Sequence, residues 1–262
     1  MKFISAQQGT PEWLAARSGV ITASCFADAI STIGGLDEKQ QKYVDVMRET
    51  GDKARACEVA GYKAAPTADA VRRALAGEEI ERPSDTAIRY ADDLAIERIS
   101  GKPYGIPAKT WLLDRGHELE DAARWRYEAQ ALGQHVTEAG LCITEDGLFG
   151  YSTDGLVGDH GLIEIKCPID STKIRTMWQT GDVSEYMHQI QGGMWITGRK
   201  WCDFIMYAPD LERCGADMYV KRIARDDLFI DAMAERLARF DRMVDNAVAM
   251  FRKAAATRAA LL

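Results

Sequence analysis

The strongest constraint on the fold is an apolar run that also carries charges, Leu-Ile-Glu-Ile-Lys at residues 162–166, which Pro168 ends. Its composition predicts a strand, because aliphatic residues favour strands and a proline closes the run. Successive strand side chains point to opposite faces, so Glu164 and Lys166 share one face. Asp154 ends an earlier apolar run, and turn residues lie between the two runs. A hairpin would therefore bring Asp154 back beside Glu164.

These charges have two interpretations. An acid and a lysine two residues apart often belong to an edge strand whose charged face is solvated. If the strand is buried instead, two charges among leucine and isoleucine are costly without partners. A divalent cation would be a partner for both Asp154 and Glu164, and Lys166 would stand beside it. That is the chemistry of a metal-dependent nuclease, and the turn residues around the stretch favour it.

The spacing of these residues also resembles a known catalytic motif. Thr-Asp-Gly at 153–155 is followed by Glu-Ile-Lys at 164–166, with nine residues between the two acids. This arrangement is similar to the motif of the PD-(D/E)xK nuclease superfamily. Thr153 stands where the superfamily usually has proline, a departure that affects backbone shape more than ligand chemistry.

Composition sets wider limits. The chain has 262 residues and a formal net charge of −7, which argues against polyanion binding over the whole surface but permits a local basic groove. Six cysteines without a CxxC pair favour buried thiols in a reducing compartment over a zinc site or a disulfide framework. With no apolar run of membrane-spanning length and no signal-peptide core, we expect a cytoplasmic protein of a bacterial or phage-infected cell.

Residues 9–30 combine a turn, a helix with Trp13 and Arg17, and a second helix expected to begin near Thr22 or Ser24. Alone, Arg17 is most simply a surface arginine; the functional alternative is a phosphate held by its guanidinium and the Ser24 hydroxyl. Trp13, Arg17 and the ITAS sequence ending at Ser24 resemble the N-terminal motif of the phage-lambda-type exonuclease family, also called YqaJ-type viral recombinases. The resemblance implies that Arg17 and Ser24 hold the 5′ phosphate of the digested strand.

A long amphipathic helix is predicted over residues 110–133, with Gly133 just past its end. The acidic residues of this helix are also consistent with an ordinary charged face that is exposed to solvent. Its RGHELEDAA sequence resembles the glycine-spaced glutamate of the same family, which implies that Glu120 is a metal ligand. His117 is given no catalytic role.

Two further positions match the family. Ser152, two residues before Asp154, resembles a family serine near the scissile or terminal phosphate. A helix predicted over residues 184–197, with Ser184 as its N-cap, carries Gln189, which resembles a family glutamine that contacts the active-site phosphate. We do not assign His188 as a base.

The remaining elements complete an α/β chain. Residues 31–84 predict a helical insertion with helices over 37–50, 52–61 and 66–76. Outside it, helices are expected over 85–101 and near 171–180. Strands are expected within 135–166 and as a pair at 201–210 and 217–224. Asp226 is expected to cap a closing helix, 226–262, whose heptad-like apolar seam is most simply explained by packing on its own sheet. We expect a single domain over 1–262, a mixed central sheet flanked by helices.

The resemblance implies a restriction-endonuclease-like core and a Mg²⁺-dependent 5′-to-3′ exonuclease on duplex DNA. It implies release of mononucleotides, a ring-shaped homotrimer, 5′-phosphorylated duplex ends as substrate, and a single-strand annealing protein as partner. Mg²⁺, with Mn²⁺ as a substitute, would be held by Glu120, Asp154, Glu164 and the backbone carbonyl of Ile165. Lys166 would orient or deprotonate the attacking water. The expected phosphate and DNA contacts are Trp13, Arg17, Ser24, Ser152 and Gln189. An endonuclease on the same core and a non-catalytic DNA-binding module remain alternatives.

Overall fold

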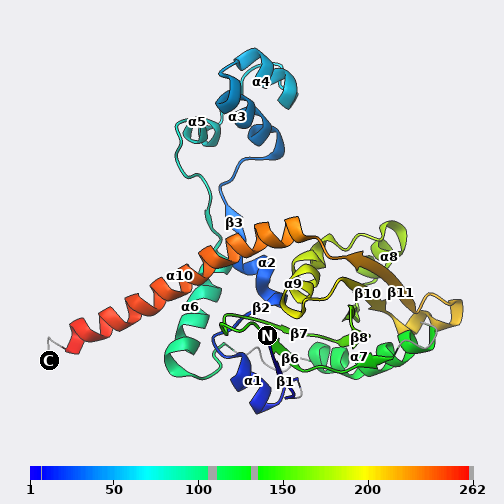
Figure 1. The fold of residues 1–262 in the computed structure, drawn as a ribbon. Helices are drawn as coiled ribbons and strands as arrows, with labels where there is room; N and C mark the ends of the chain where they lie inside the picture. The colour runs from blue at the N-terminus through cyan, green and yellow to red at the C-terminus, as the bar shows by residue number, and fades with distance from the viewer. Residues whose placement is uncertain (7, 106–110, 131–134, 260–262) are drawn as a thin grey trace. The chain divides into compact units, whose positions relative to one another are not determined.

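The computed structural model describes residues 1–6, 8–105, 111–130 and 135–259, and it has the predicted mixed α/β architecture (Figure 1). The α-helices are α1 (Pro11–Arg17), α2 (Phe26–Ala29), α3 (Glu38–Thr50), α4 (Lys53–Ala60), α5 (Asp69–Leu75), α6 (Asp85–Ser100), α7 (Trp111–Gln130), α8 (Ser171–Thr180), α9 (Met187–Thr197) and α10 (Asp227–Ala259). The strands are β1 (Lys2–Ile4), β2 (Ile21–Thr22), β3 (Thr32–Ile33), β4 (Arg82–Pro83), β5 (Val136–Thr137), β6 (Leu141–Ile143), β7 (Phe149–Ser152), β8 (Gly155–Val157), β9 (Gly161–Lys166), β10 (Trp201–Tyr207) and β11 (Met218–Ala224). Short 3₁₀ segments are η1 (Ala23–Cys25), η2 (Ser184–Tyr186) and η3 (Pro209–Cys214).

The chain forms two compact units, one of Met1–Ala29 with Tyr90–Leu262 and one of Ile30–Arg89. The smaller unit contains the segment predicted as a helical insertion. Its helices α3, α4 and α5 enclose a core of their own, made of Tyr43, Val44, Ala56, Ala60, Val71 and Ala74. Strands β3 and β4, which the sequence pattern does not predict, pair antiparallel within this unit.

The larger unit contains a five-stranded mixed sheet in the order β11-β10-β9-β8-β5. Strand β9 carries the Glu-Ile-Lys run and lies between β8, to which it is antiparallel, and β10, to which it is parallel. The interpretation as an edge strand with a solvated face is therefore wrong, and the Glu164 side chain is only 1% exposed. Strands β10 and β11 form the predicted antiparallel pair.

A second sheet, in the order β1-β6-β7-β2, brings the N-terminal segment to the strand before Asp154. Strand β2 pairs in parallel with β7, so Thr22 lies opposite Gly150. The helix expected to start near Thr22 or Ser24 is instead the 3₁₀ segment η1 followed by the short α2, and Thr22 makes no side-chain capping bond. The sheet pairing fixes Thr22 in an extended conformation that delays the helix.

Helix α9 approaches the sheets closely because it carries two adjacent glycines. A Cβ on Gly192 would lie 2.7 Å from the Phe26 ring, and a Cβ on Gly193 would lie 2.7 Å from Cζ of Tyr151. Gln189 is about one turn earlier on the same helix, so this close approach carries it to the sheet. The predicted N-cap is wrong: Ser184 opens the 3₁₀ segment η2, and the α-helix proper begins at Met187.

Replacing Gly193 with alanine should lower the thermal unfolding temperature. Alanine in a helix interior normally stabilises by roughly 0.5–1 kcal/mol relative to glycine. Here the added methyl meets the buried Tyr151 ring, and overpacking costs about 1–3 kcal/mol. The matched control is Gly116→Ala in α7, where nothing lies within 4 Å of the added Cβ. That control should unfold at the same or a higher temperature, and a stabilised Gly193→Ala would contradict the packing account.

Helix α10 begins as predicted, since the Asp226 carboxylate accepts the backbone N–H of Phe229 at 3.0 Å. Its buried residues are Ile230, Met233, Leu237, Phe240 and Val244. It packs against helices α9 and α2. The heptad-like seam therefore serves helix–helix packing within the larger unit.

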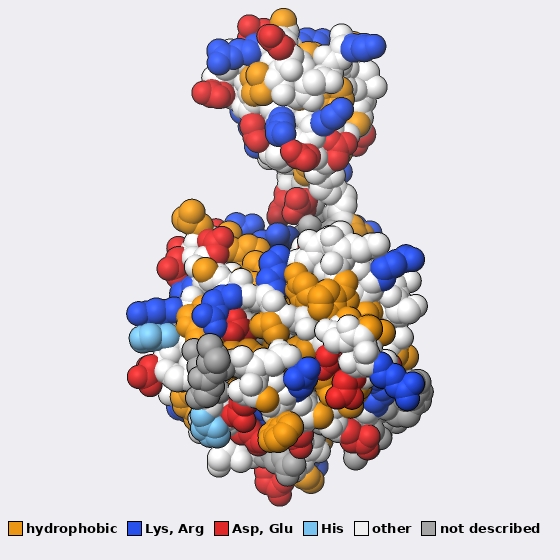
Figure 2. Space-filling model, turned by 90° about the vertical axis from the view of Figure 1, so that its right-hand side faces the viewer, with side chains coloured by type: hydrophobic (Ala, Val, Ile, Leu, Met, Phe, Trp, Pro, Cys, Tyr) orange, Lys and Arg blue, Asp and Glu red, His pale blue; other side chains and the backbone are white. Residues whose placement is uncertain are grey.

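The surface agrees with the charge argument from composition. On the face drawn in Figure 2, Lys and Arg side chains are interspersed with Asp and Glu side chains. Within the described part of the chain, no helix has the length and apolar character needed to cross a membrane.

Candidate active site

The site is built around Glu164 on the central strand β9. Its Oε2 accepts the hydroxyl of Tyr151 at 2.8 Å, from the neighbouring sheet. Its Oε1 accepts Nζ of Lys166 at 2.8 Å and Nε2 of Gln189 at 2.5 Å. Gln189 also accepts Nζ of Lys166 at 3.2 Å, so strand alternation and the approach of α9 bring three predicted residues together.

Asp154 follows β7 at the start of the β8–β9 hairpin and reaches β9, as the sequence predicts. Its Oδ2 accepts the backbone N–H of Ile165 at 2.6 Å. Burial raises the pKa of Asp154 well above its ordinary value, and the charges of Glu164 and Glu120 raise it further. The carboxylates of Glu164 and Glu120 thus both disfavour the ionised form of Asp154.

Lys166 lies beside these acids with its side chain 29% exposed. Burial alone would lower its pKa, but the carboxylates of Glu164 and Asp154 outweigh burial and raise the pKa above the ordinary lysine value. Its Nζ also lies 5.7 Å from the centre of the Tyr186 ring. A lysine acting as a base needs a lowered pKa, so these surroundings favour an ammonium that orients groups and balances charge.

The donor set fits a hard divalent cation. Asp154, Glu164 and Glu120 offer carboxylate oxygens, the preferred ligands of Mg²⁺, and a positive ion would relieve the repulsion that Asp154 experiences from the other two. In the described ranges no three His, Cys, Asp or Glu side chains are already grouped as a metal site. Glu164 Oε1 already accepts two hydrogen bonds and Oε2 accepts one, so a metal ion would share either oxygen with these donors. The Ile165 carbonyl stays a predicted ligand, and the His117 side chain lies outside the described residues.

A second cluster gathers the N-terminal motif. The Trp13 indole Nε1 donates to Oγ of Ser152 at 3.1 Å. The Arg17 guanidinium lies over the Trp13 ring, 4.6 Å from its centre, and donates to Oγ1 of Thr22 at 3.2 Å. Oγ of Thr22 and Oγ of Ser24 are 3.4 Å apart. Arg17 is therefore held in a defined direction by its neighbours, unlike a free surface arginine.

One pocket of about 630 Å³ joins the two clusters. Trp13 and Ser152 line it together with Glu120 and Asp154. Lys166 and Tyr186 line a separate pocket of about 280 Å³. Two of the predicted phosphate residues, Trp13 and Ser152, therefore share a pocket with two of the predicted metal carboxylates, Glu120 and Asp154.

Several contributing residues were not predicted. Tyr151 bonds Glu164, Thr22 bridges Arg17 and Ser24, and Arg124 donates Nη1 to the Asp154 carbonyl at 3.1 Å. Thr22 lies inside the ITAS sequence, which could have pointed to it, whereas Tyr151 reads only as an apolar strand residue. The His188 ring packs against Phe229 of α10, 5.1 Å between ring centres, and takes no part in these clusters.

The chain is similar to a family model and to several solved structures. The YqaJ-like viral recombinase domain matches residues 12–200. The alkaline exonuclease LHK-Exo from Laribacter hongkongensis is similar at 30% identity and a TM-score of 0.67, over 95% of this chain and 99% of that chain. Its complex with dAMP is similar at 32% identity with the same TM-score and coverage. A phage related exonuclease from Haemophilus somnus 129PT, at 16% identity and a TM-score of 0.56 over 88% of this chain and 96% of that one, shares the fold.

The comparison with curated proteins found no match. The solved structures confirm the predicted fold class, an α/β fold with a restriction-endonuclease-like core. The domain match covers well over half of the sequence and contains all the residues of both clusters. This chain therefore belongs to the YqaJ-like viral recombinase family.

Proposed function

We propose that this protein is a Mg²⁺-dependent 5′-to-3′ exonuclease that degrades duplex DNA and releases 5′ mononucleotides. The observation that carries the proposal is the shared pocket, where Asp154 and Glu120 lie with Trp13 and Ser152 of the second cluster. Family membership and the alkaline exonuclease neighbours support a DNA exonuclease. The dAMP bound to one neighbour is a mononucleotide, the class of product proposed here.

The catalytic half of the site would work through Glu164 and its partners. Glu120, Asp154, Glu164 and the Ile165 carbonyl would hold Mg²⁺, which supplies an activated water and stabilises the leaving oxygen. Lys166, already an ammonium beside Glu164, would stabilise negative charge that develops on the phosphate in the transition state. Gln189 holds the Lys166 ammonium and the Glu164 carboxylate in one arrangement, which fixes the direction of both.

The phosphate half of the site would define where the strand begins. Arg17 offers a bidentate fork to a terminal phosphate, and Trp13 and Thr22 fix its orientation. Ser24, close to the Thr22 hydroxyl, and Ser152, which accepts from Trp13, would add hydroxyl donors. A terminal phosphate bound here would present the first phosphodiester of the strand to the carboxylates.

Two broader proposals follow the resemblance to lambda-type exonucleases. The protein would assemble as a homotrimeric ring around the DNA, and its 3′ single-stranded product would pass to a single-strand annealing protein. Membership of a viral recombinase family supports a role in recombination. Sedimentation of the purified protein, alone and with DNA, tests the ring.

The experiment for the proposed activity compares DNA ends. Purified protein and Mg²⁺ are incubated with linear duplexes carrying either a 5′ phosphate or a 5′ hydroxyl, and with a covalently closed circle. We expect preferential loss of the 5′-phosphorylated strand and an untouched circle. Cutting of the circle would support an endonuclease, and survival of every substrate in both Mg²⁺ and Mn²⁺ would support a non-catalytic DNA-binding module.

Arg17→Ala should reduce the preference for the phosphorylated end by about tenfold or more, since hydrogen bonds to charged groups are worth about 1.5–3 kcal/mol. The loss should appear on 5′-phosphorylated duplexes and be small on 5′-hydroxyl duplexes. Arg252→Ala, an exposed arginine on α10, is the control for loss of one positive charge. An unchanged preference in Arg17→Ala would remove Arg17 from the phosphate site.

A further inference from the structure

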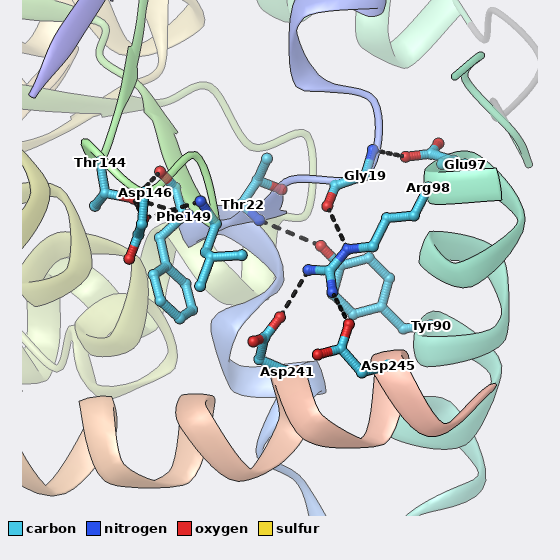
Figure 3. Close-up of polar contacts among 11 residues, drawn as sticks. Gly19, Thr22, Tyr90, Glu97, Arg98, Thr144, Asp146, Phe149, Asp241 and Asp245 are labelled. Atoms are coloured by element: carbon cyan, nitrogen blue, oxygen red, sulfur yellow. Dashed lines mark hydrogen bonds and ion pairs between the residues drawn. The ribbon is translucent and has the colours of Figure 1, made fainter. Parts of the chain in front are cut away.

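Helix α6 shapes the backbone next to Arg17. Gly19 lies two residues after Arg17 with φ +75°, a left-handed conformation that favours glycine. Its N–H donates to Oε2 of Glu97 at 2.7 Å, and its carbonyl accepts Nε of Arg98 at 3.1 Å (Figure 3). The backbone N–H and the carbonyl of Gly19 are therefore both held by side chains of α6, which come from two consecutive residues.

A third α6 side chain holds the other end of the same segment. The Tyr90 hydroxyl accepts the backbone N–H of Thr22 at 3.2 Å. Thr22 is the residue whose hydroxyl accepts from Arg17. Tyr90 and Glu97 also line, together with Arg17, a pocket of about 170 Å³. The backbone on both sides of the Arg17–Thr22 contact is thus fixed by α6.

Helix α10 in turn fixes these α6 side chains. Nη2 of Arg98 donates to Asp241 at 2.7 Å and Nη1 donates to Asp245 at 3.0 Å (Figure 3). The Arg98 and Asp241 side chains are only 18% and 16% exposed, so this pair is little screened by water. The Tyr90 ring stacks on Phe240, with centres 5.4 Å apart and planes 22° apart. The closing helix therefore reaches the phosphate cluster through two independent contacts.

We infer that Tyr90 and Arg98 are positioning residues that set the preference for a 5′-phosphorylated end, and that Asp241 of α10 holds Arg98 in place. The inference rests on the proposed function of Arg17. Neither residue is assigned a contact with DNA. They fix the segment from Gly19 to Thr22, so that the guanidinium fork of Arg17 meets a terminal phosphate at one distance and angle.

The physical reason is the steep dependence of a charged, bidentate hydrogen bond on geometry. A displacement of about 1 Å in a positioned group can cost on the order of a hundredfold in rate. Among the described residues, the side-chain bonds to the backbone of the segment from Gly19 to Thr22 come from Glu97, Arg98 and Tyr90. Removing them leaves the left-handed turn at Gly19 without side-chain support. Removing these bonds should therefore weaken recognition of the terminal phosphate.

The test uses two variants that remove bonds and keep bulk. Arg98→Met keeps an unbranched chain against Gly19 and removes its hydrogen bonds and ion pairs. Tyr90→Phe removes one oxygen and keeps the ring on Phe240. For each variant kcat and KM are measured on 5′-phosphorylated and 5′-hydroxyl duplexes. We expect the ratio of kcat/KM values, phosphorylated over hydroxyl, to fall by about tenfold, mainly through a higher KM on the phosphorylated end.

Matched controls separate positioning from general stability. Arg199 donates Nη1 to the carbonyls of Gly158 and Gly161 in a distant turn, so Arg199→Met removes comparable arginine–glycine bonds elsewhere. It should keep the wild-type preference even if its unfolding temperature falls. Asp241→Asn should reproduce part of the Arg98→Met loss. Asp245→Asn should change little, because the Asp245 side chain is 67% exposed and such surface pairs are weak.

The possible results distinguish the phosphate role of Arg17 from the positioning role of Tyr90 and Arg98. A wild-type enzyme that degrades both ends equally well overturns the assignment of Arg17, and the inference with it. A wild-type preference that survives in folded Arg98→Met and Tyr90→Phe overturns the inference alone. A preference lost in both variants and kept in Arg199→Met supports it, and an equal loss in Arg199→Met would reduce the effect to stability and overturn it.

Discussion

Lys166→Ala should hydrolyse DNA at least about a hundredfold more slowly than the wild-type protein, the scale expected for a positioned catalytic group. The reason is its position: Nζ lies 2.8 Å from Glu164 and 3.2 Å from Gln189, with a raised pKa that keeps it charged. The variant should still fold, because Tyr151 and Gln189 continue to bond the Glu164 carboxylate. The measurement is the single-turnover rate at saturating protein, with duplex binding measured separately in Ca²⁺.

Lys200→Ala is the matched control for this variant. Strands β9 and β10 are parallel, with Gly161 opposite Trp201 and Lys166 opposite Met206. Lys200 precedes β10 and is exposed, so it lies at the other end of the same sheet. Lys200→Ala should keep the single-turnover rate within about twofold of wild type, since surface substitutions away from a site usually have small effects. Full activity in Lys166→Ala would remove this lysine from the catalytic role.

Asp154→Asn should abolish most activity and at the same time raise the unfolding temperature measured in a chelator. Burial and the neighbouring charges of Glu164 and Glu120 raise the pKa of Asp154, which means that its ionised form is unfavourable in the folded protein. Asparagine removes that charge and can still accept the Ile165 N–H through its amide oxygen. A gain in stability together with a loss of activity would mark the aspartate as functional and destabilising.

The raised pKa of Asp154 also makes the free energy of unfolding depend on pH. A carboxyl group with a raised pKa binds its proton more tightly in the folded state than in the unfolded state. Its contribution to stability is fully present below the unfolded pKa of about 4 and is lost as the pH rises through the folded pKa. In a chelator, wild-type stability should therefore fall across this range more than that of Asp154→Asn.

Mg²⁺ provides the complementary measurement. A ligand that binds only the folded state stabilises it by mass action, so Mg²⁺ should raise the unfolding temperature of the wild-type protein. The increase should be much smaller in Asp154→Asn, which has lost a carboxylate ligand. Equal Mg²⁺ stabilisation of both proteins, or an Asp154→Asn variant less stable than wild type in chelator, would contradict the repulsion account.

The parts of the site that could be predicted are those whose geometry is local. Strand alternation alone places Glu164 and Lys166 on one face, and the hairpin returns Asp154 to Ile165. Helices α3, α4, α5, α6 and α8 lie close to their predicted ranges, because caps and breakers are encoded in nearby residues, such as the Asp37–Gln40 capping box at the start of α3.

The parts that escaped prediction depend on contacts between distant segments. Tyr151 reads as an apolar strand residue, and only the approach of β7 to β9 shows that its hydroxyl meets Glu164. Strands of two or three residues, such as β1 and β3, have no periodicity to detect and exist through their pairing partners. The support that α6 and α10 give to Gly19 joins residues 79 and more than 140 positions apart, which no local pattern reveals.

The direction of digestion is measured most directly by following the two ends of one labelled strand. A linear duplex carries a label on the 5′-phosphorylated end or on the 3′ end of the same strand, and the products formed in Mg²⁺ are separated by size. A 5′-to-3′ exonuclease releases the 5′ label first as a mononucleotide, while the 3′ label stays on strands that become progressively shorter. Release of the 3′ label first, or internal fragments without mononucleotides, would contradict it.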